Sequence, residues 1–173
     1  KLGESNILTN IYLPKKDGTT TEVDLLLVNA TGIYVFESKN YSGWIFGDEK
    51  NKMWTQSLKG GQKNKFFNPI WQNKGHISAL EEHLDKKHTD YFYSYIIFSE
   101  RCELKKVNYT SVNVSVIKRN SLMCVLKKHI AASPNRLSPE EVRDIYSKLK
   151  SRTLADEDTK KRHIEEIKVK YKV

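Results

Sequence analysis

Short apolar segments separated by turn-prone residues occupy the first quarter of the chain. Residues 7–13, 23–28 and 33–37 are rich in branched and aromatic side chains, which favour extended structure. Pro14 and the turn-prone residues after it end the first segment. The other two segments are separated by residues 29–32, which have loop composition, and together they predict a buried β-hairpin.

A second, smaller hairpin is predicted further along the chain. Residues 44–46 and 53–55 flank the turn-prone residues 47–51, and we expect this hairpin to be exposed and rich in lysine. Residues 59–65 contain glycine and lysine but lack the phosphate-binding spacing G-x-x-x-x-G-K-[ST]. They predict a flexible basic loop.

Two helix starts carry capping signals. Asn68 has the character of an N-cap and is followed by Pro69, which suits the first helical position. Apolar residues then recur at helical spacing from Ile70 to Leu84. The run Ser-Pro-Glu-Glu at residues 138–141 predicts a capping box at the start of a second helix.

Residues 91–98 and 112–117 predict two further core strands, the second with valine at alternate positions, and residues 122–130 predict a short helix. Strands and helices therefore mix in the order of an α/β protein. We expect one domain over residues 1–150, with a central mixed β-sheet flanked by helices, and a charged C-terminal helix or tail over residues 151–173.

Composition narrows the classes of partner and compartment. The 30 Lys and Arg residues exceed the 21 Asp and Glu residues, so the formal net charge of +9 favours a polyanionic partner such as nucleic acid. The sequence contains no uninterrupted apolar stretch long enough to predict a membrane span. Cys102 and Cys124 are too few for a disulfide scaffold or a four-thiolate zinc site, which suggests a reducing cytoplasm. We interpret both as buried small hydrophobic residues.

The most informative residues are Asp24, Glu37 and Lys39, because they carry charge within otherwise apolar strands. If the hairpin closes symmetrically, with Val28 facing Ile33, then Asp24 faces Glu37. Directly opposed like charges are destabilising unless a cation lies between them. The two-residue period of a strand also puts Glu37 and Lys39 on one face.

This constellation predicts a metal site for phosphodiester hydrolysis. The carboxylates of Asp24 and Glu37 and the backbone carbonyl of Ser38 form an all-oxygen ligand set, which suits Mg²⁺ or Mn²⁺. Such a cation lowers the pKa of water and neutralises charge on phosphate oxygens, while Lys39 can orient the attacking water. The alternative is a solvated Glu37–Lys39 pair at a strand end, with Asp24 on the outer face.

Several motifs, in order, resemble the nuclease-related domain family, which is assigned to the PD-(D/E)XK nuclease-like superfamily. The resemblance covers about residues 1–150, and its restriction-endonuclease-like core matches the α/β fold expected above. The motifs are GE at residues 3–4, NIYLP at 10–14, TTTEVD at 19–24, GIYVFESKNYSGWI at 32–45, NPIWQNKGHI at 68–77 and FSERCELKKV at 98–107.

By that resemblance Asp24 matches the metal-binding Asp of the superfamily, and Glu37 with Lys39 matches its E-x-K. Glu4 matches an early helix Glu that supports the metal, although only nine residues separate it from Pro14, fewer than the family usually has. Gln72 matches the Gln of the family's helix start and implies a contact to DNA or to a metal-bound water. The alternative for Gln72 is ordinary helix-surface polarity, and His76 shares its helix face.

We therefore expect a Mg²⁺-dependent deoxyribonuclease of PD-(D/E)XK type, acting on DNA in processing or repair. Asp24, Glu37, Lys39, Gln72 and Glu4 are its expected catalytic residues. A second hypothesis is a non-catalytic nucleic-acid-binding or tethering module that retains the nuclease fold. A third is attachment to anionic membranes through the basic tail.

The three tryptophans, Trp44, Trp54 and Trp71, have two interpretations: packing in the core, or stacking on unpaired bases.

Overall fold

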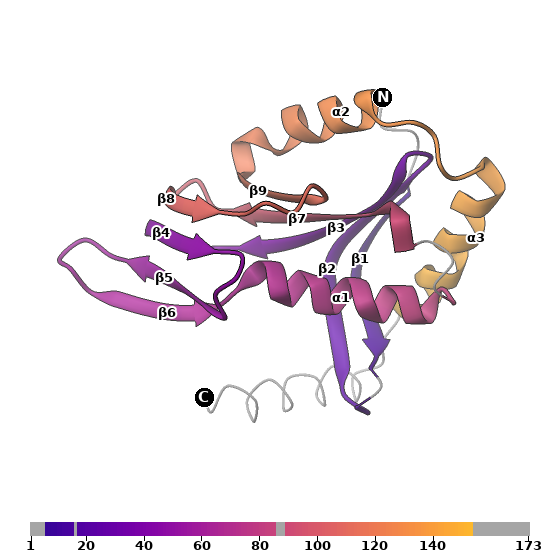
Figure 1. The fold of residues 1–173 in the computed structure, drawn as a ribbon. Coiled ribbons are helices and arrows are strands. Elements are labelled where there is room, and N and C mark those ends of the chain that lie inside the picture. Colours follow the sequence, from indigo (N-terminus) through magenta and orange to yellow (C-terminus); the bar gives the residue numbers. More distant parts are fainter. Residues whose placement is uncertain (1–5, 16, 86–88, 154–173) are drawn as a thin grey trace.

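The computed structural model describes residues 6–15, 17–85 and 89–153, which form two β-sheets and three α-helices (Figure 1). Three short 3₁₀ helices add single turns at residues 89–91, 119–121 and 151–153. The main elements in chain order are β1 (Ile7–Pro14), β2 (Thr20–Asn29), β3 (Gly32–Lys39), β4 (Gly43–Asp48), β5 (Met53–Ser57), β6 (Lys63–Phe67), α1 (Pro69–His83), β7 (Phe92–Phe98), β8 (Cys102–Asn108), β9 (Val114–Lys118), α2 (Leu122–Ala132) and α3 (Pro139–Lys150).

The larger sheet has five strands in the order β1-β2-β3-β7-β9. β1, β2 and β3 pair antiparallel, whereas β3, β7 and β9 pair parallel, so the sheet is mixed. Apolar residues of α1 and α3 pack on one face, and α2 packs on the other (Figure 1). This arrangement confirms the expected α/β fold and is consistent with a restriction-endonuclease-like core.

The predicted hairpin of β2 and β3 is confirmed, including its register. Val28 pairs with Ile33 and Leu25 pairs with Phe36, as the symmetric closure requires. The turn is held by Asn29, whose side-chain oxygen accepts hydrogen bonds from both the backbone N–H and the hydroxyl of Thr31. This register places Asp24 and Glu37 at the open end of the paired segment.

The second sheet has four strands in the order β6-β5-β4-β8. The predicted hairpin of β4 and β5 is present but only half exposed, because Ile45 and Trp54 are fully buried on its inner face. The expected basic loop is wrong over its second half: β6 begins at Lys63, after a turn at Gly60 and Gly61. The sequence pattern does not predict strand β8, because most of its side chains are polar and face solvent.

Helix α1 begins where its capping signal predicts. The side-chain oxygen of Asn68 accepts a hydrogen bond from the backbone N–H of Ile70, and its amide group donates to the backbone carbonyls of Asp48, Glu49 and Asn51. Asn68 is fully buried, so this one side chain ties the β4–β5 turn to the start of α1. The capping box at the start of α3 is also confirmed.

Two details of the core, at Cys124 and Val112, differ from the prediction. Cys102 is buried as expected, but Cys124 is exposed on α2, because it lies on the helix face opposite the buried Leu126. Val112 is fully exposed, and the strand expected to contain it begins at Val114.

The expected tail at residues 151–173 lies almost entirely outside the described residues, which end at residue 153, so the domain boundary stays a prediction. In the part of the chain that the structure describes, none of the helices has the length and apolar character needed to cross a membrane.

Gly47 of β4 provides a test of how the two sheets pack. A Cβ atom at this position would lie 2.1 Å from the Cδ2 atom of Trp54, whose ring stacks on Phe98. We expect Gly47→Ala to lower the free energy of unfolding by about 1–3 kcal/mol through overpacking, measured by urea denaturation.

Gly75 is the matched control, because nothing lies within 4 Å of a Cβ atom built there, on the exposed side of α1. Gly75→Ala should raise the free energy of unfolding by up to about 1 kcal/mol through helix propensity. Equal stability of Gly47→Ala and the wild type would contradict the packing described.

Candidate active site

The residues singled out in the sequence lie where the C-terminal end of β3 meets the first turns of α1. Val35, Glu37 and Lys39 alternate along β3, and Val35 packs in the core beneath α1 and α3. Glu37 is only 3% exposed, so the alternative of a solvated Glu37–Lys39 pair is wrong. A buried carboxylate requires partners that compensate for its lost hydration.

Both carboxylate oxygens of Glu37 have such a partner. Its Oε1 atom lies 2.7 Å from Lys39 Nζ, and its Oε2 atom lies 3.0 Å from His76 Nε2. Beyond these contacts, Lys39 Nζ donates to Gln72 Oε1 at 2.8 Å, and His76 Nδ1 lies 2.7 Å from the hydroxyl of Thr21. The five side chains form one continuous hydrogen-bonded chain, which runs from Thr21 on β2 to His76 on α1, then to the two residues of β3 and back to Gln72 on α1.

Helix α1 supplies two members of this chain, four residues apart. Gln72 and His76 share the face of α1 that lies over β3, as their spacing predicts. Asn73, fully buried between them, donates through its side-chain amide to the backbone carbonyl of Val35 and to the hydroxyl of Ser94. These bonds set the position of α1 along the central strands.

Asp24 lies in β2 beside this chain, at a break in the regular strand pairing. Its Oδ2 atom accepts a hydrogen bond from the backbone N–H of Ser38 at 3.3 Å. On the other side, Asn10 of β1 adopts a left-handed backbone conformation with φ of 52°. Asn is one of the few residues that tolerate this conformation, which occurs often at functional sites.

The two acids have pKa shifts of opposite sign. Burial, together with the nearby charge of Glu37, raises the pKa of Asp24 above its ordinary value. Burial would also raise the pKa of Glu37, but the hydrogen bond from His76 and the charge of Lys39 more than offset it and hold that pKa below its ordinary value. The charge of Glu37 contributes to the raised pKa of Asp24, as expected for two acids that lie near each other at the end of the β2–β3 hairpin.

The ligand atoms available here match those that a hard divalent cation prefers, since the carboxylates of Asp24 and Glu37 and the backbone carbonyl of Ser38 all offer oxygen. In geometry, each oxygen of Glu37 already has one partner, Lys39 or His76, and keeps a second lone pair that could bind a metal. Among the residues that the structure describes, no group of three or more His, Cys, Asp or Glu side chains is placed to hold a metal ion. The site fits a metal held by few side chains.

The structure therefore brings Asp24, Glu37, Ser38, Lys39 and Gln72 together, whereas Glu4 lies outside the described residues. His76, which the sequence identifies only as a neighbour of Gln72 on the helix, binds Glu37 directly.

The sequence pattern does not identify Thr21 as part of the site. Val23, Leu26 and Val28 of β2 pack in the same core cluster, whereas Leu27 packs on the other face, so the alternation changes phase near Asp24. Simple alternation from Asp24 would point Thr21 to the other face of the sheet.

Comparison with known proteins agrees with the motif resemblance. The sequence model of a family described as "Nuclease-related domain" matches residues 1–99, more than half of the chain. An uncharacterized protein of Bacillus anthracis is 32% identical over 165 residues, an alignment that covers 95% of this chain and 75% of that protein. No solved structure matches the chain.

The opposite pKa shifts predict opposite effects on stability. Asp24→Asn should raise the melting temperature at pH 7, because it removes a carboxylate whose ionisation is disfavoured in the folded state. The gain should shrink as the pH falls through the raised pKa toward the ordinary value of 3.8, since the wild-type carboxyl is then neutral as well.

Glu37→Gln should instead lower the free energy of unfolding at pH 7, by about 1–3 kcal/mol, because Lys39 and His76 lose a buried charged partner. Thermal and urea unfolding in a metal chelator measure both variants. If the two substitutions changed stability in the same direction, the electrostatic account of the site would be wrong.

Proposed function

The chain belongs to the nuclease-related domain family, and we propose that it is a metal-dependent nuclease that hydrolyses DNA phosphodiester bonds, in DNA processing or repair. The observation that carries this proposal is the ammonium group of Lys39, held between Glu37 and Gln72, next in the chain to Ser38, whose backbone N–H binds the carboxylate of Asp24. A site with two acids and a positioned lysine is suited to transfer at a phosphate, where charge must be neutralised and water oriented.

Asp24, Glu37 and the backbone carbonyl of Ser38 would hold Mg²⁺, with Mn²⁺ as a substitute. When bound, such a cation supplies Lewis-acid activation of the phosphate and neutralises part of its charge. The raised pKa of Asp24 supports this role, because a carboxylate that is partly buried and close to a second acid is stabilised by an added cation.

Lys39 would orient the attacking water and stabilise negative charge on the phosphate oxygens. Its ammonium group makes two hydrogen bonds, to Glu37 and Gln72, which fix its direction within the site. Gln72 thus acts through Lys39 as a positioning residue, and His76 does the same for Glu37. The net charge of +9 favours the approach of a polyanionic substrate.

A second candidate function is a nucleic-acid-binding or tethering module without turnover. The pairing of both Glu37 oxygens, one with Lys39 and one with His76, favours it, because the buried acid has partners without a metal. The two functions differ in one measurable respect. The module would bind DNA in a salt-sensitive way and yield no metal-dependent products.

The test is cleavage of plasmid and oligonucleotide DNA with Mg²⁺, with Mn²⁺ and with a chelator. We expect metal-dependent cleavage that Asp24→Asn, Glu37→Gln and Lys39→Met each reduce by about 10²–10⁴-fold. Asp144→Asn, which removes an exposed carboxylate paired with Lys148 on α3, is the matched control and should leave cleavage unchanged. Activity that survives all three site substitutions would remove these residues from the mechanism.

A further inference from the structure

The four-stranded sheet has an outer face that the proposed active site does not use. Alternate residues of each strand point away from the core, and the strand register places them side by side across the sheet. One row runs through Lys106, Phe46, Thr55 and Lys65, each paired with the next. The next row runs through Glu103, Trp44, Ser57 and Lys63.

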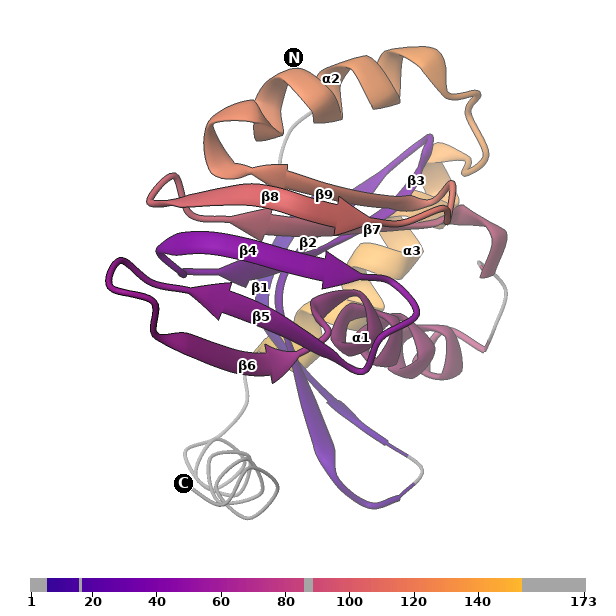
Figure 2. The same cartoon turned by 60° about the vertical axis from the view of Figure 1, so that its left-hand side comes forward.

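Aromatic side chains lie at the centre of this face and remain open to solvent. Trp44 is 51% exposed and Phe46 is 37% exposed, although the residue between them, Ile45, is fully buried. Met53, 41% exposed, extends the apolar surface along β5. Figure 2 shows the sheet from this side, with no described helix lying across it. Exposed aromatic residues grouped in this way are typical of a binding surface.

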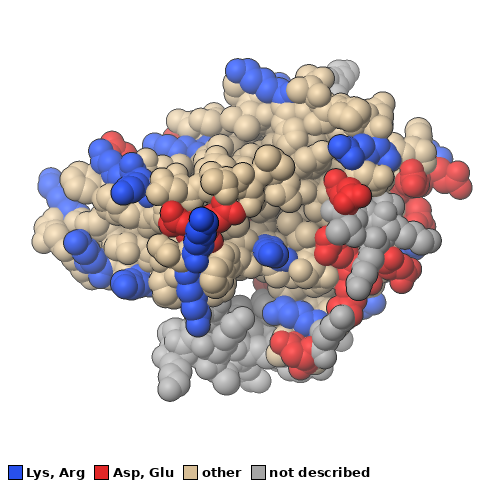
Figure 3. Space-filling view, in the orientation of Figure 1, with Lys and Arg blue, Asp and Glu red and all other residues tan. Residues whose placement is uncertain are grey.

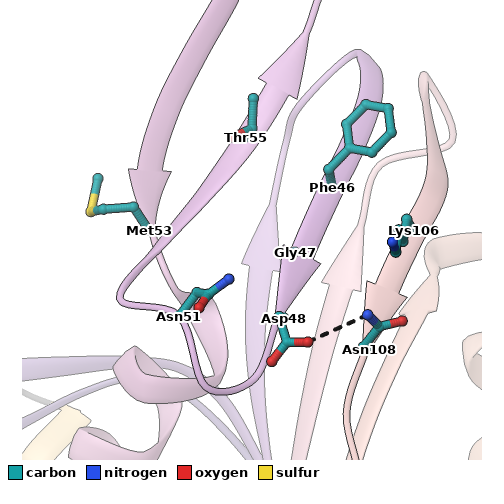
Figure 4. Close-up of a pocket in the computed structure, with 8 residues that line it drawn as sticks. All are labelled: Phe46, Gly47, Asp48, Asn51, Met53, Thr55, Lys106 and Asn108. Carbon is teal, nitrogen blue, oxygen red and sulfur yellow. Dashed lines mark hydrogen bonds between the residues drawn. The ribbon is translucent and has the colours of Figure 1, made fainter.

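Beside Phe46 the face contains a shallow hollow of about 300 Å³, close to the lower limit for ligand pockets. Figure 4 shows it between Phe46 on β4, Thr55 on β5 and Asn108 on β8. The carboxylate of Asp48 accepts a hydrogen bond from Asn108 at its edge. The hollow therefore combines an aromatic wall with groups able to hydrogen-bond a planar ring.

Positive charge lines both margins of the aromatic centre. Lys63 and Lys65 lie on the β6 side, and Lys105 and Lys106 lie on the β8 side, all exposed. The ammonium group of Lys105 lies 5.2 Å from the centre of the Trp44 ring and also pairs with Glu103. Lys and Arg side chains gather over the end of the molecule formed by β4–β6, whereas Asp and Glu gather at the opposite end (Figure 3).

We infer that this outer face binds single-stranded nucleic acid, with bases stacked on Trp44 and Phe46 and phosphates along the flanking lysines. Aromatic rings on an open sheet, bordered by positive charge, form a stacking surface that tolerates any base sequence. Unpaired bases suit it, since the bases of a duplex are already stacked on one another. The choice of DNA as ligand rests on the proposed function.

The position of the face relative to the active site supports this assignment. Trp44 follows Lys39 by five residues, so their Cα atoms are at most about 17 Å apart. The intervening segment is held by Arg101, whose guanidinium donates to the side chain and backbone carbonyl of Asn40. A nucleic-acid strand bound to the face would therefore lie close to the active site, because only a short, held segment of protein separates the two.

The experiment measures the binding of a labelled oligothymidylate of about 20 nucleotides by fluorescence anisotropy, with a chelator present to prevent cleavage. Joint substitution by Trp44→Ala and Phe46→Ala should raise the Kd at least about tenfold. Met123→Ala, which removes an apolar side chain 48% exposed on α2, should leave the Kd unchanged.

The lysines are tested through salt dependence. Joint Lys63→Ala and Lys65→Ala should reduce the slope of log Kd against log salt by about 0.7 for each phosphate that the variant no longer neutralises. Lys127→Ala with Lys128→Ala removes the same charge from the exposed side of α2, and the slope should not change.

Tryptophan fluorescence separates stacking from a loss of folding. Trp44→Phe should still bind DNA, but DNA should no longer quench the tryptophan fluorescence of the protein. Trp71→Phe should still show this quenching. A duplex that binds as tightly as the single strand, or a Kd unaffected by the aromatic substitutions, would overturn the inference. The inference would also be overturned if Trp44→Ala with Phe46→Ala changed the sedimentation coefficient of the protein but left its DNA binding unaltered. That result would identify the face as a contact between copies of the chain.

These outcomes are independent of turnover. Binding that depends on Trp44 and Phe46, in a protein that never cleaves DNA, would support the face and reject the nuclease. Cleavage of DNA by a protein whose Kd does not change when Trp44 and Phe46 are substituted would support the nuclease function and reject the binding role of the face.

Discussion

A carboxylate in the interior is the constraint on which the rest of this structure depends. Glu37 lies near the end of a central strand and is almost inaccessible to solvent, where an unpaired charge carries a large free-energy cost. Lys39 and His76 remove most of that cost by binding one oxygen each. His76 can do so only if α1 lies at one height over β3, and Asn73 holds α1 there through Val35. A charged Glu37 can therefore be buried only if α1 is held in this position.

Asp24 shows the other side of the same arrangement. Its carboxylate gains a hydrogen bond from Ser38 but is partly desolvated and repelled by Glu37, so its pKa rises. The regular pairing of β1 and β2 also fails at this point, where Asn10 is left-handed. Features that are unfavourable for folding, gathered at one place, are typical of residues retained for function at the expense of stability.

Much of this arrangement could be predicted from the sequence, because local patterns determine it. The symmetric register of the β2–β3 hairpin follows from its apolar runs, and the start of α1 follows from Asn68 and Pro69. The contact between Thr21 and His76 could not be predicted, since it depends on a change of phase in β2 that only packing against β1 and α1 produces. Strands β6 and β8 could not be predicted for a related reason: each covers only part of its side chains with residues distant in the chain and exposes its lysines to solvent.

The buried side chain of Asn68 joins the turn between β4 and β5 to the start of α1, and Trp71 adds a second link through the carbonyl of Glu49. Asn68 binds three carbonyls of the turn between β4 and β5 while it caps α1, the helix that carries Gln72 and His76. The small sheet and this helix are therefore fixed to each other at the start of α1. A substitution that disturbs this junction would also affect Lys39 and Glu37, because their partners Gln72 and His76 follow Asn68 on the same helix.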